Sequence, residues 1–133
     1  MSKLLAVPFL VICGLATAAV PSGERLVYLV GCINCHHQTP KEIINAPPLV
    51  IVQAYSLPEF KKLMKTGITR TGRDMLAQSS LMGIVATEQF SHFTDEEVVA
   101  VYNFLHNTWT TDRAQKEEAK IPLLYKPKPE PGK

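Results

Sequence analysis

The stretch that decides the fold is CINCH, residues 32 to 36, in which two cysteines flank two other residues and a histidine follows the second cysteine. This CxxCH spacing is the attachment motif for a c-type haem. The thiols of Cys32 and Cys35 each add across a vinyl group of the porphyrin, and His36 follows where it can coordinate the iron from one face. The motif therefore predicts one covalently bound haem c, with its iron, held by these three residues.

Two other uses of the cysteine pair fit the sequence less well. A redox disulfide of the thioredoxin type belongs to a βαβ context, and the flanking sequence has no such pattern. A zinc site would require the adjacent side chains of His36 and His37 to share one ion although neighbouring side chains point apart, and no second ligand pair stands at zinc-finger spacing. The haem interpretation is therefore favoured.

Length and composition indicate one small globular domain. The chain has 133 residues, 46% hydrophobic and 20% charged, with a formal net charge of +2. These values exclude a disordered or collagen-like chain, and a nearly neutral chain is a poor general binder of nucleic acid. No apolar stretch long enough to cross a bilayer follows residue 20, so no internal membrane span is expected.

Residues 1–18 predict a secretory signal peptide. Lys3 precedes a short apolar run from Leu4 to Leu15, and small residues follow it. We expect cleavage after about Ala18 and a location in the periplasm. The alternative, an uncleaved anchor, would have to span about 30 Å of hydrocarbon with a run that is short for it. Cys13 would leave with the signal, so both cysteines of the mature chain belong to the motif.

Three helices are expected in the mature chain. The first begins after Ser22 and ends near Gly31, just before the cysteines. The second begins at Ser56, where SLPE is a capping box, and ends at Gly67. The third begins at Thr94, where TDEE is a second capping box. The predicted fold class is therefore all-α.

The remaining segments are predicted to be irregular. Residues 38–54 and 68–91 would be long loops, the second with room for a helical turn or two, and loops of this length are usually functional. From residue 110 the sequence becomes charged and then alternates proline with other residues, which favours extended polyproline geometry. We therefore expect a domain over residues 19–109 and a charged, proline-rich extension, an appendage, over residues 110–133.

A haem also needs a second axial ligand or an open site, and this choice separates an electron carrier from a ligand-binding haem protein. His37 directly follows the proximal histidine and cannot reach the opposite face of the porphyrin. His106 suits the end of a helix without any metal. Met75, Met82 and His92 are left as candidates, and a methionine would raise the reduction potential, which suits a carrier.

At this point the sequence resembles a known family, the class I c-type cytochromes, and in particular the small single-haem domains that partner periplasmic dehydrogenases. The resemblance covers roughly residues 23–108. It rests on CINCH at 32–36, FKKLMKTG at 60–67 followed by Gly72-Arg73, Leu81-Met82, and FTDEEVVAVYNFL at 93–105. It implies the cytochrome c fold, in which three main helices with long loops wrap around one covalent haem.

The resemblance also implies roles for particular residues. Members of the family hold the iron with a methionine on the loop before the last helix, and Met82 matches that position, with Met75 in reserve. A proline carbonyl after the motif commonly accepts the Nδ1 proton of the proximal histidine, here His36. Pro47 or Pro48 is the match, and such a bond fixes the ring and makes the ligand more electron-rich.

Packing between helices is implied as well. In the family the first and last helices cross near a small residue. The corresponding contact here would place Gly31 or its neighbours against Tyr102 and Leu105.

The function implied is one-electron transfer between a redox partner, such as a periplasmic dehydrogenase or oxidase, and the respiratory chain, without enzymatic activity of its own. Membrane contact would come only through a partner. Between Lys41 and Arg73 stand six basic and two acidic residues, which would steer an acidic partner if they border the haem edge. The other interpretation is that they form the solvated face of a helix.

Two alternatives remain open. The chain could be a fixed electron-accepting subunit of a dehydrogenase, clamped to its partner by residues 121–133. It could also be a haem protein with an open site, acting as a gas sensor or in a peroxidase-like manner, which would require both methionines to be free of the iron.

Overall fold

A computed structural model describes residues 19–37 and 46–120. The elements in chain order are α1 (Gly23–Leu29), α2 (Cys32–Cys35), the 3₁₀ helix η1 (Leu49–Ala54), α3 (Leu57–Thr66), α4 (Leu81–Glu88), the 3₁₀ helix η2 (Phe90–His92), α5 (Asp95–Thr108) and α6 (Thr111–Lys120). Within these ranges the chain forms no β-strand, only an isolated bridge between Ile68 and Asp74. The predicted all-α class is confirmed.

The three predicted helices begin where the capping residues placed them. The Ser22 hydroxyl accepts from Arg25 N at 3.2 Å and starts α1. Ser56 N donates to a Glu59 carboxylate oxygen at 2.8 Å before α3, and Thr94 N donates to Glu97 in the same way at 2.8 Å before α5. These bonds satisfy backbone N–H groups that a helix leaves without a partner at its first turn. Local chemistry alone therefore fixes these three boundaries.

Two α-helices lie in segments that were predicted as loop or extension. The prediction allowed a helical turn or two in the first segment and named no helix in the second. Residues 81–88 form α4 inside the predicted loop 68–91, and residues 111–120 form α6 inside the predicted extension. The sequence of α4 combines glycine with β-branched residues, which have lower helix propensity, and is apolar on most sides. The sequence of α6 is polar except for buried Ala114, so it shows little apolar periodicity.

The crossing of α1 and α5 occurs at a different glycine from the predicted one. A Cβ atom at Gly23 would lie 1.9 Å from the Ala100 carbonyl oxygen, so only glycine allows this approach. A Cβ at Gly31 would instead meet the Asn34 side chain. The Tyr102 hydroxyl donates to the carbonyl of Tyr55, the residue after η1. The prediction named Gly31 or its neighbours against Tyr102 and Leu105. Gly31 itself does not meet α5, but the two helices do pack together, and Leu105 shares the core with Val27 and the neighbouring Val30.

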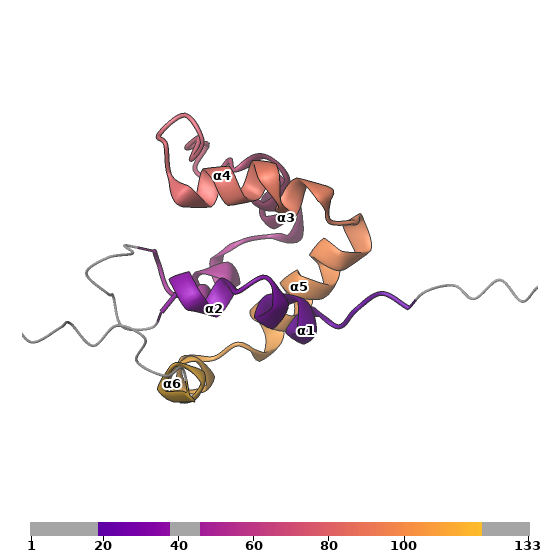
Figure 1. Cartoon of the computed structure of the whole chain (residues 1–133), viewed down its shortest axis with the longest axis vertical. Helices are drawn as coiled ribbons and strands as arrows, with labels where there is room; N and C mark the ends of the chain where they lie inside the picture. The colour runs from indigo at the N-terminus through magenta and orange to yellow at the C-terminus, as the bar shows by residue number, and fades with distance from the viewer. Residues whose placement is uncertain (1–18, 38–45, 121–133) are drawn as a thin grey trace, which may run out of the picture.

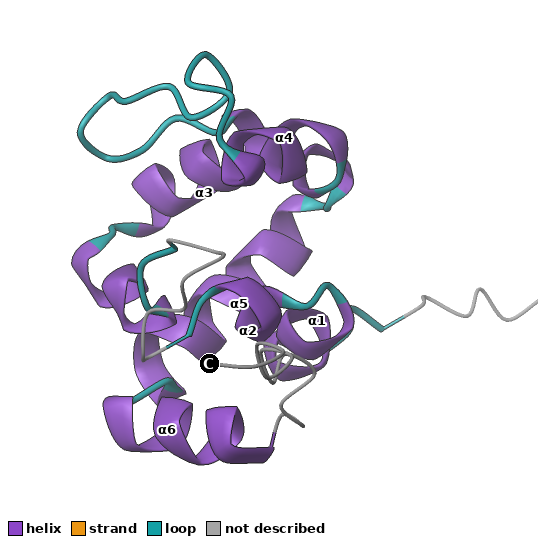
Figure 2. Ribbon diagram, turned by 60° about the vertical axis from the view of Figure 1, so that its left-hand side comes forward, coloured by secondary structure: helices purple, strands orange, loops and turns teal. Residues whose placement is uncertain are grey.

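The core lies between α1, η1, α3 and α5. Its largest fully buried side chains come from α1 and α5 and from the residue after α5: Val27, Val98, Val101, Leu105 and Trp109. Tyr102 joins η1 to α5 by donating its hydroxyl to the Tyr55 carbonyl oxygen at 2.9 Å, and its ring lies 5.5 Å from that of Phe60. α3 and α4 pack on each other at one end of the molecule, whereas α6 lies at the other end (Figures 1 and 2).

Several predictions fall on residues outside the described ranges. These are the signal peptide over residues 1–18, the first part of the loop after the motif, residues 38–45 with Lys41, and the proline-rich segment 121–133.

Candidate functional site

The CINCH motif forms one helical turn, α2. Gly31 precedes it with φ of 74°, and Asn34 N donates to the Gly31 carbonyl at 2.9 Å. The last bond of the turn runs from His36 N to the Cys32 carbonyl at 3.0 Å. Residues three positions apart lie on the same side of a helix, so this turn brings Cys32 and Cys35 to one face. Both are half-buried, and they are not joined to each other in a disulfide.

The side chain of His36 is oriented by a backbone carbonyl. Its Nδ1 lies 2.6 Å from the Pro47 carbonyl oxygen. Because a carbonyl can only accept, Nδ1 carries the proton and donates, which in the neutral ring leaves Nε2 with a free lone pair. Burial lowers the pKa of His36, against the opposing effect of this hydrogen bond, and so favours the neutral ring. A neutral imidazole with a free Nε2 is the form that ligates a metal.

The hydrogen bond to His36 also distinguishes the two prolines. The carbonyl of Pro48 accepts from Ile51 N at 3.0 Å and starts η1. The carbonyl of Pro47, one residue earlier, is the one that meets the histidine ring. Of the two prolines that the resemblance offered, the structure gives this contact to Pro47.

The environment of Cys32 bears on the thiol-redox alternative. Burial is the main cause that raises the pKa of the Cys32 thiol to about 12. A redox-active or nucleophilic cysteine is instead activated by a lowered pKa, since the thiolate is the attacking species. A raised pKa at Cys32 thus runs opposite to the shift that activates a thioredoxin-type nucleophile.

His37 points toward α6 and not toward a shared metal site with His36. Its Nε2 donates to the Asn34 carbonyl at 2.8 Å, and its Nδ1 lies 3.5 Å from a Glu118 carboxylate oxygen. Only 6% of the side chain is exposed. In residues 19–37 and 46–120 no three His, Cys, Asp or Glu side chains gather as ligands for an ion. His37 thus connects the turn of the motif, through Asn34, to Glu118 of α6.

The two candidate methionines lie at the same end of α4. Met82 stands in the first turn of that helix, not on a loop as expected, and packs half-buried against the core. Met75 belongs to the turn on which α4 rests, since a Cβ at Gly83 would lie 2.4 Å from the Met75 carbonyl carbon. Met75 N donates to the Gly67 carbonyl at 3.0 Å and ties this turn to the end of α3.

The histidines considered as axial ligands occupy other positions. His92 is exposed at the end of η2. His106 lies near the end of α5, where its Nδ1 donates to the Asn107 side chain at 3.0 Å and its ring lies 4.9 Å from that of Tyr102.

Most of the described basic side chains between residues 41 and 73 are tied to the protein itself. Lys61 donates to Asp95 at 2.7 Å, and Lys65 donates to the carbonyls of Ser91 and Phe93. The two arginines bond likewise: Arg70 to the Ala54 carbonyl and Arg73 to the Gln78 side chain. These contacts give the basic residues a structural use, and steering of an acidic partner stays a prediction.

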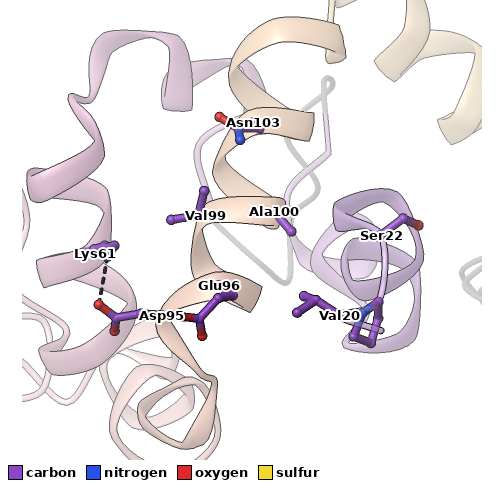
Figure 3. A pocket seen from close by; sticks show the side chains of 9 residues that line it. Val20, Ser22, Lys61, Asp95, Glu96, Val99, Ala100 and Asn103 are labelled. Atoms are coloured by element: carbon purple, nitrogen blue, oxygen red, sulfur yellow. Dashed lines mark hydrogen bonds and ion pairs between the residues drawn. The ribbon is translucent and has the colours of Figure 1, made fainter. Parts of the chain in front are cut away.

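One hollow of the described surface contains no residue of the motif. It is an open groove of about 570 Å³ between residues 20–22, Lys61 of α3 and the first half of α5 (Figure 3). The Lys61–Asp95 ion pair stands at its side (Figure 3). None of the predicted haem-binding residues lines it.

The sequence did not predict that side chains of α6, and of a residue that links α5 to α6, lie beside the motif. Trp109, with 2% of its surface exposed, and Glu118 line a small cavity together with His37. A signal was present in the sequence, because Thr110 caps α6 by accepting from Arg113 N at 3.2 Å. A threonine followed by an acidic first turn is a helix start that the polar composition obscured.

None of the described helices is long and apolar enough to cross a membrane. Comparison of the chain with known protein families, with curated protein sequences and with solved structures found no match.

Proposed function

We propose that this chain is a monohaem c-type cytochrome that carries one electron between redox partners in the periplasm. The observation that supports the proposal most directly is the geometry of the motif. Cys32 and Cys35 share one face of a helical turn, and the histidine that follows donates Nδ1 to a backbone carbonyl at 2.6 Å. This donor set fits a haem attached by two thioethers and ligated by His36 Nε2.

Each residue has a defined part in this proposal. Cys32 and Cys35 would hold the porphyrin covalently, and His36 Nε2 would ligate the iron. The Pro47 carbonyl keeps the imidazole in one tautomer and makes Nε2 a stronger donor. Met82 would supply the second ligand to the iron, and Met75 is the alternative. When bound, the haem supplies an iron that alternates between the ferric and ferrous states, which is the one-electron chemistry of a carrier.

Covalent attachment is the first consequence to test. The full chain is expressed with a bacterial haem-attachment system, denatured, and examined by haem staining and intact mass. We expect a mass increase of one haem that survives denaturation, and its loss when Cys32→Ala and Cys35→Ala are combined. Cys13→Ala is the matched control, because this cysteine lies outside the motif and its replacement should leave the haem attached. A parent protein without covalent haem would overturn the proposal.

A further inference from the structure

A small cavity lies between the turn of the motif and α6. It measures about 10 Å³, and its lining includes His37, Trp109, Ala114 and Glu118. A space of this size is about the smallest that holds one water molecule. Because α6 was expected to be part of an appendage, this contact between it and the motif is new information from the structure.

Two buried polar atoms belong to side chains that line this cavity. His37 Nδ1 and Trp109 Nε1 have no hydrogen-bond partner among the described protein groups. The side chains are 6% and 2% exposed, so bulk solvent does not reach them. Buried polar groups are nearly always satisfied by protein or by ordered water. Glu118 lies 3.5 Å from His37 Nδ1, which is too long for a charge-assisted hydrogen bond.

The donors and acceptors around the cavity complement one water molecule. His37 Nε2 donates to the Asn34 carbonyl, so Nδ1 of the neutral ring is an acceptor. The indole N–H of Trp109 can only donate, and the Glu118 carboxylate can only accept. A water can accept from the indole and donate to the other two, which gives the three bonds typical of a buried water.

We propose that a single buried water occupies this cavity and bridges His37 Nδ1, Trp109 Nε1 and the Glu118 carboxylate. This water ties α6 to the turn that carries the two cysteines. Ile33 and His36 of the motif also line the cavity, but none of the three polar groups that hold the water belongs to the haem-binding set, and the site does not require that a haem be present. The water proposal can therefore fail while the haem proposal holds, and the haem proposal can fail while the water proposal holds.

The test uses the indole N–H of Trp109, which gives one NMR signal because the chain has a single tryptophan. The sample is the full chain as purified, treated with a reductant. We expect the Trp109 indole N–H to exchange slowly with solvent and to show a nuclear Overhauser effect to water with the sign of a long-lived bound molecule. Ala114→Val should abolish that effect, because the added methyl groups fill the cavity. Ala119→Val, at an exposed position of α6, is the matched control and should preserve it.

Two results would overturn this proposal. One is the absence of the water effect in the parent protein. The other is an undiminished water effect in Ala114→Val, which would place the bound water outside this cavity. If Ala114→Val does not fold, a high-resolution crystal structure of the parent decides the matter. It must show a water within hydrogen-bond distance of both His37 Nδ1 and Trp109 Nε1.

Discussion

Met75 and Met82 are seven residues apart in the sequence but belong to neighbouring parts of the fold, because the start of α4 rests on the turn that contains Met75. Both sulfurs are therefore carried by one small region. The packing of Gly83 against that turn fixes the helix to it. Proximity to α4 alone thus does not choose between them, and the choice requires substitution of each.

We expect Met82→Ala to remove the weak far-red absorption band that reports methionine bound to ferric haem, and to lower the reduction potential. Met75→Ala, the matched control, should keep the band. The measurement is the oxidised and reduced absorption spectrum of each purified variant. Loss of the band only in Met75→Ala would transfer the ligand role to that residue. Prompt carbon monoxide binding by the reduced parent would instead favour an open site.

The sequence was sufficient to nominate the residues around His36 but not to choose the acceptor of its proton. Pro47 and Pro48 are adjacent and equally able to offer a carbonyl. The choice follows from the start of η1, which uses the Pro48 carbonyl for Ile51 N and leaves that of Pro47 for the ring. Such a choice depends on the path of the backbone, which residue identities do not specify.

At the scale of elements, the helices that could be predicted are those whose ends carry their own chemistry. α3 and α5 have capping boxes, and Gly67 ends α3 with φ of 72°. α4 was expected only as a helical turn or two, and α6 was not expected although Thr110 caps its start; tertiary contacts support both helices. α4 rests on the turn before it, and α6 is held by Arg113, which pairs with Glu24 of α1. Neither contact leaves a periodic pattern in the sequence.

The ion pair between α3 and α5 gives a prediction about acid stability. The hydrogen bond from Lys61, followed by its charge, lowers the pKa of Asp95 below its usual 3.8. A lowered folded-state pKa means that the unfolded chain binds the proton more readily. The pair therefore stabilises the fold above about pH 4, and this contribution is lost as the pH falls through the lowered pKa.

We expect Asp95→Asn to reduce the loss of stability on acidification, measured as the midpoint of urea unfolding between pH 6 and pH 3. The effect should be small, because both partners are partly or largely exposed and surface pairs contribute little. Glu96→Gln removes a carboxylate from the same turn and leaves the pair intact, so it serves as the control. Equal pH profiles for the parent and Asp95→Asn would contradict the assignment.

At the scale of the whole molecule, α6 is part of the packed structure. Arg113 places its guanidinium 4.7 Å from the centre of the Phe104 ring and 5.7 Å from that of Trp109. It also pairs with Glu24 at 2.5 Å. Ala114 of the same helix is buried. The division of the chain at residue 109 that composition suggested therefore runs through a contact surface.

Removal of residues 110–133 should destabilise the protein by about 2 kcal/mol or more, because it uncovers Trp109 and abolishes the contacts of Arg113. The measurement is denaturant unfolding followed by circular dichroism. A chain that ends at Lys120 keeps every contact of α6 described above and is the control, for which we expect little change. Equal stability of both truncated chains would show that α6 contributes nothing to the fold.

The acceptor of the hydrogen bond that orients His36 is insensitive to substitution of its own residue, whereas the thiols of Cys32 and Cys35 are lost when those residues are replaced. This acceptor is a main-chain oxygen, and every residue that could replace Pro47 would still supply one. No substitution of Pro47 removes this acceptor, whereas a substitution of His36 removes the donor. A change in the backbone path leading into η1 would move the Pro47 carbonyl and alter the bond. The orientation of the His36 ring therefore depends on the backbone conformation and not on the side chain at position 47.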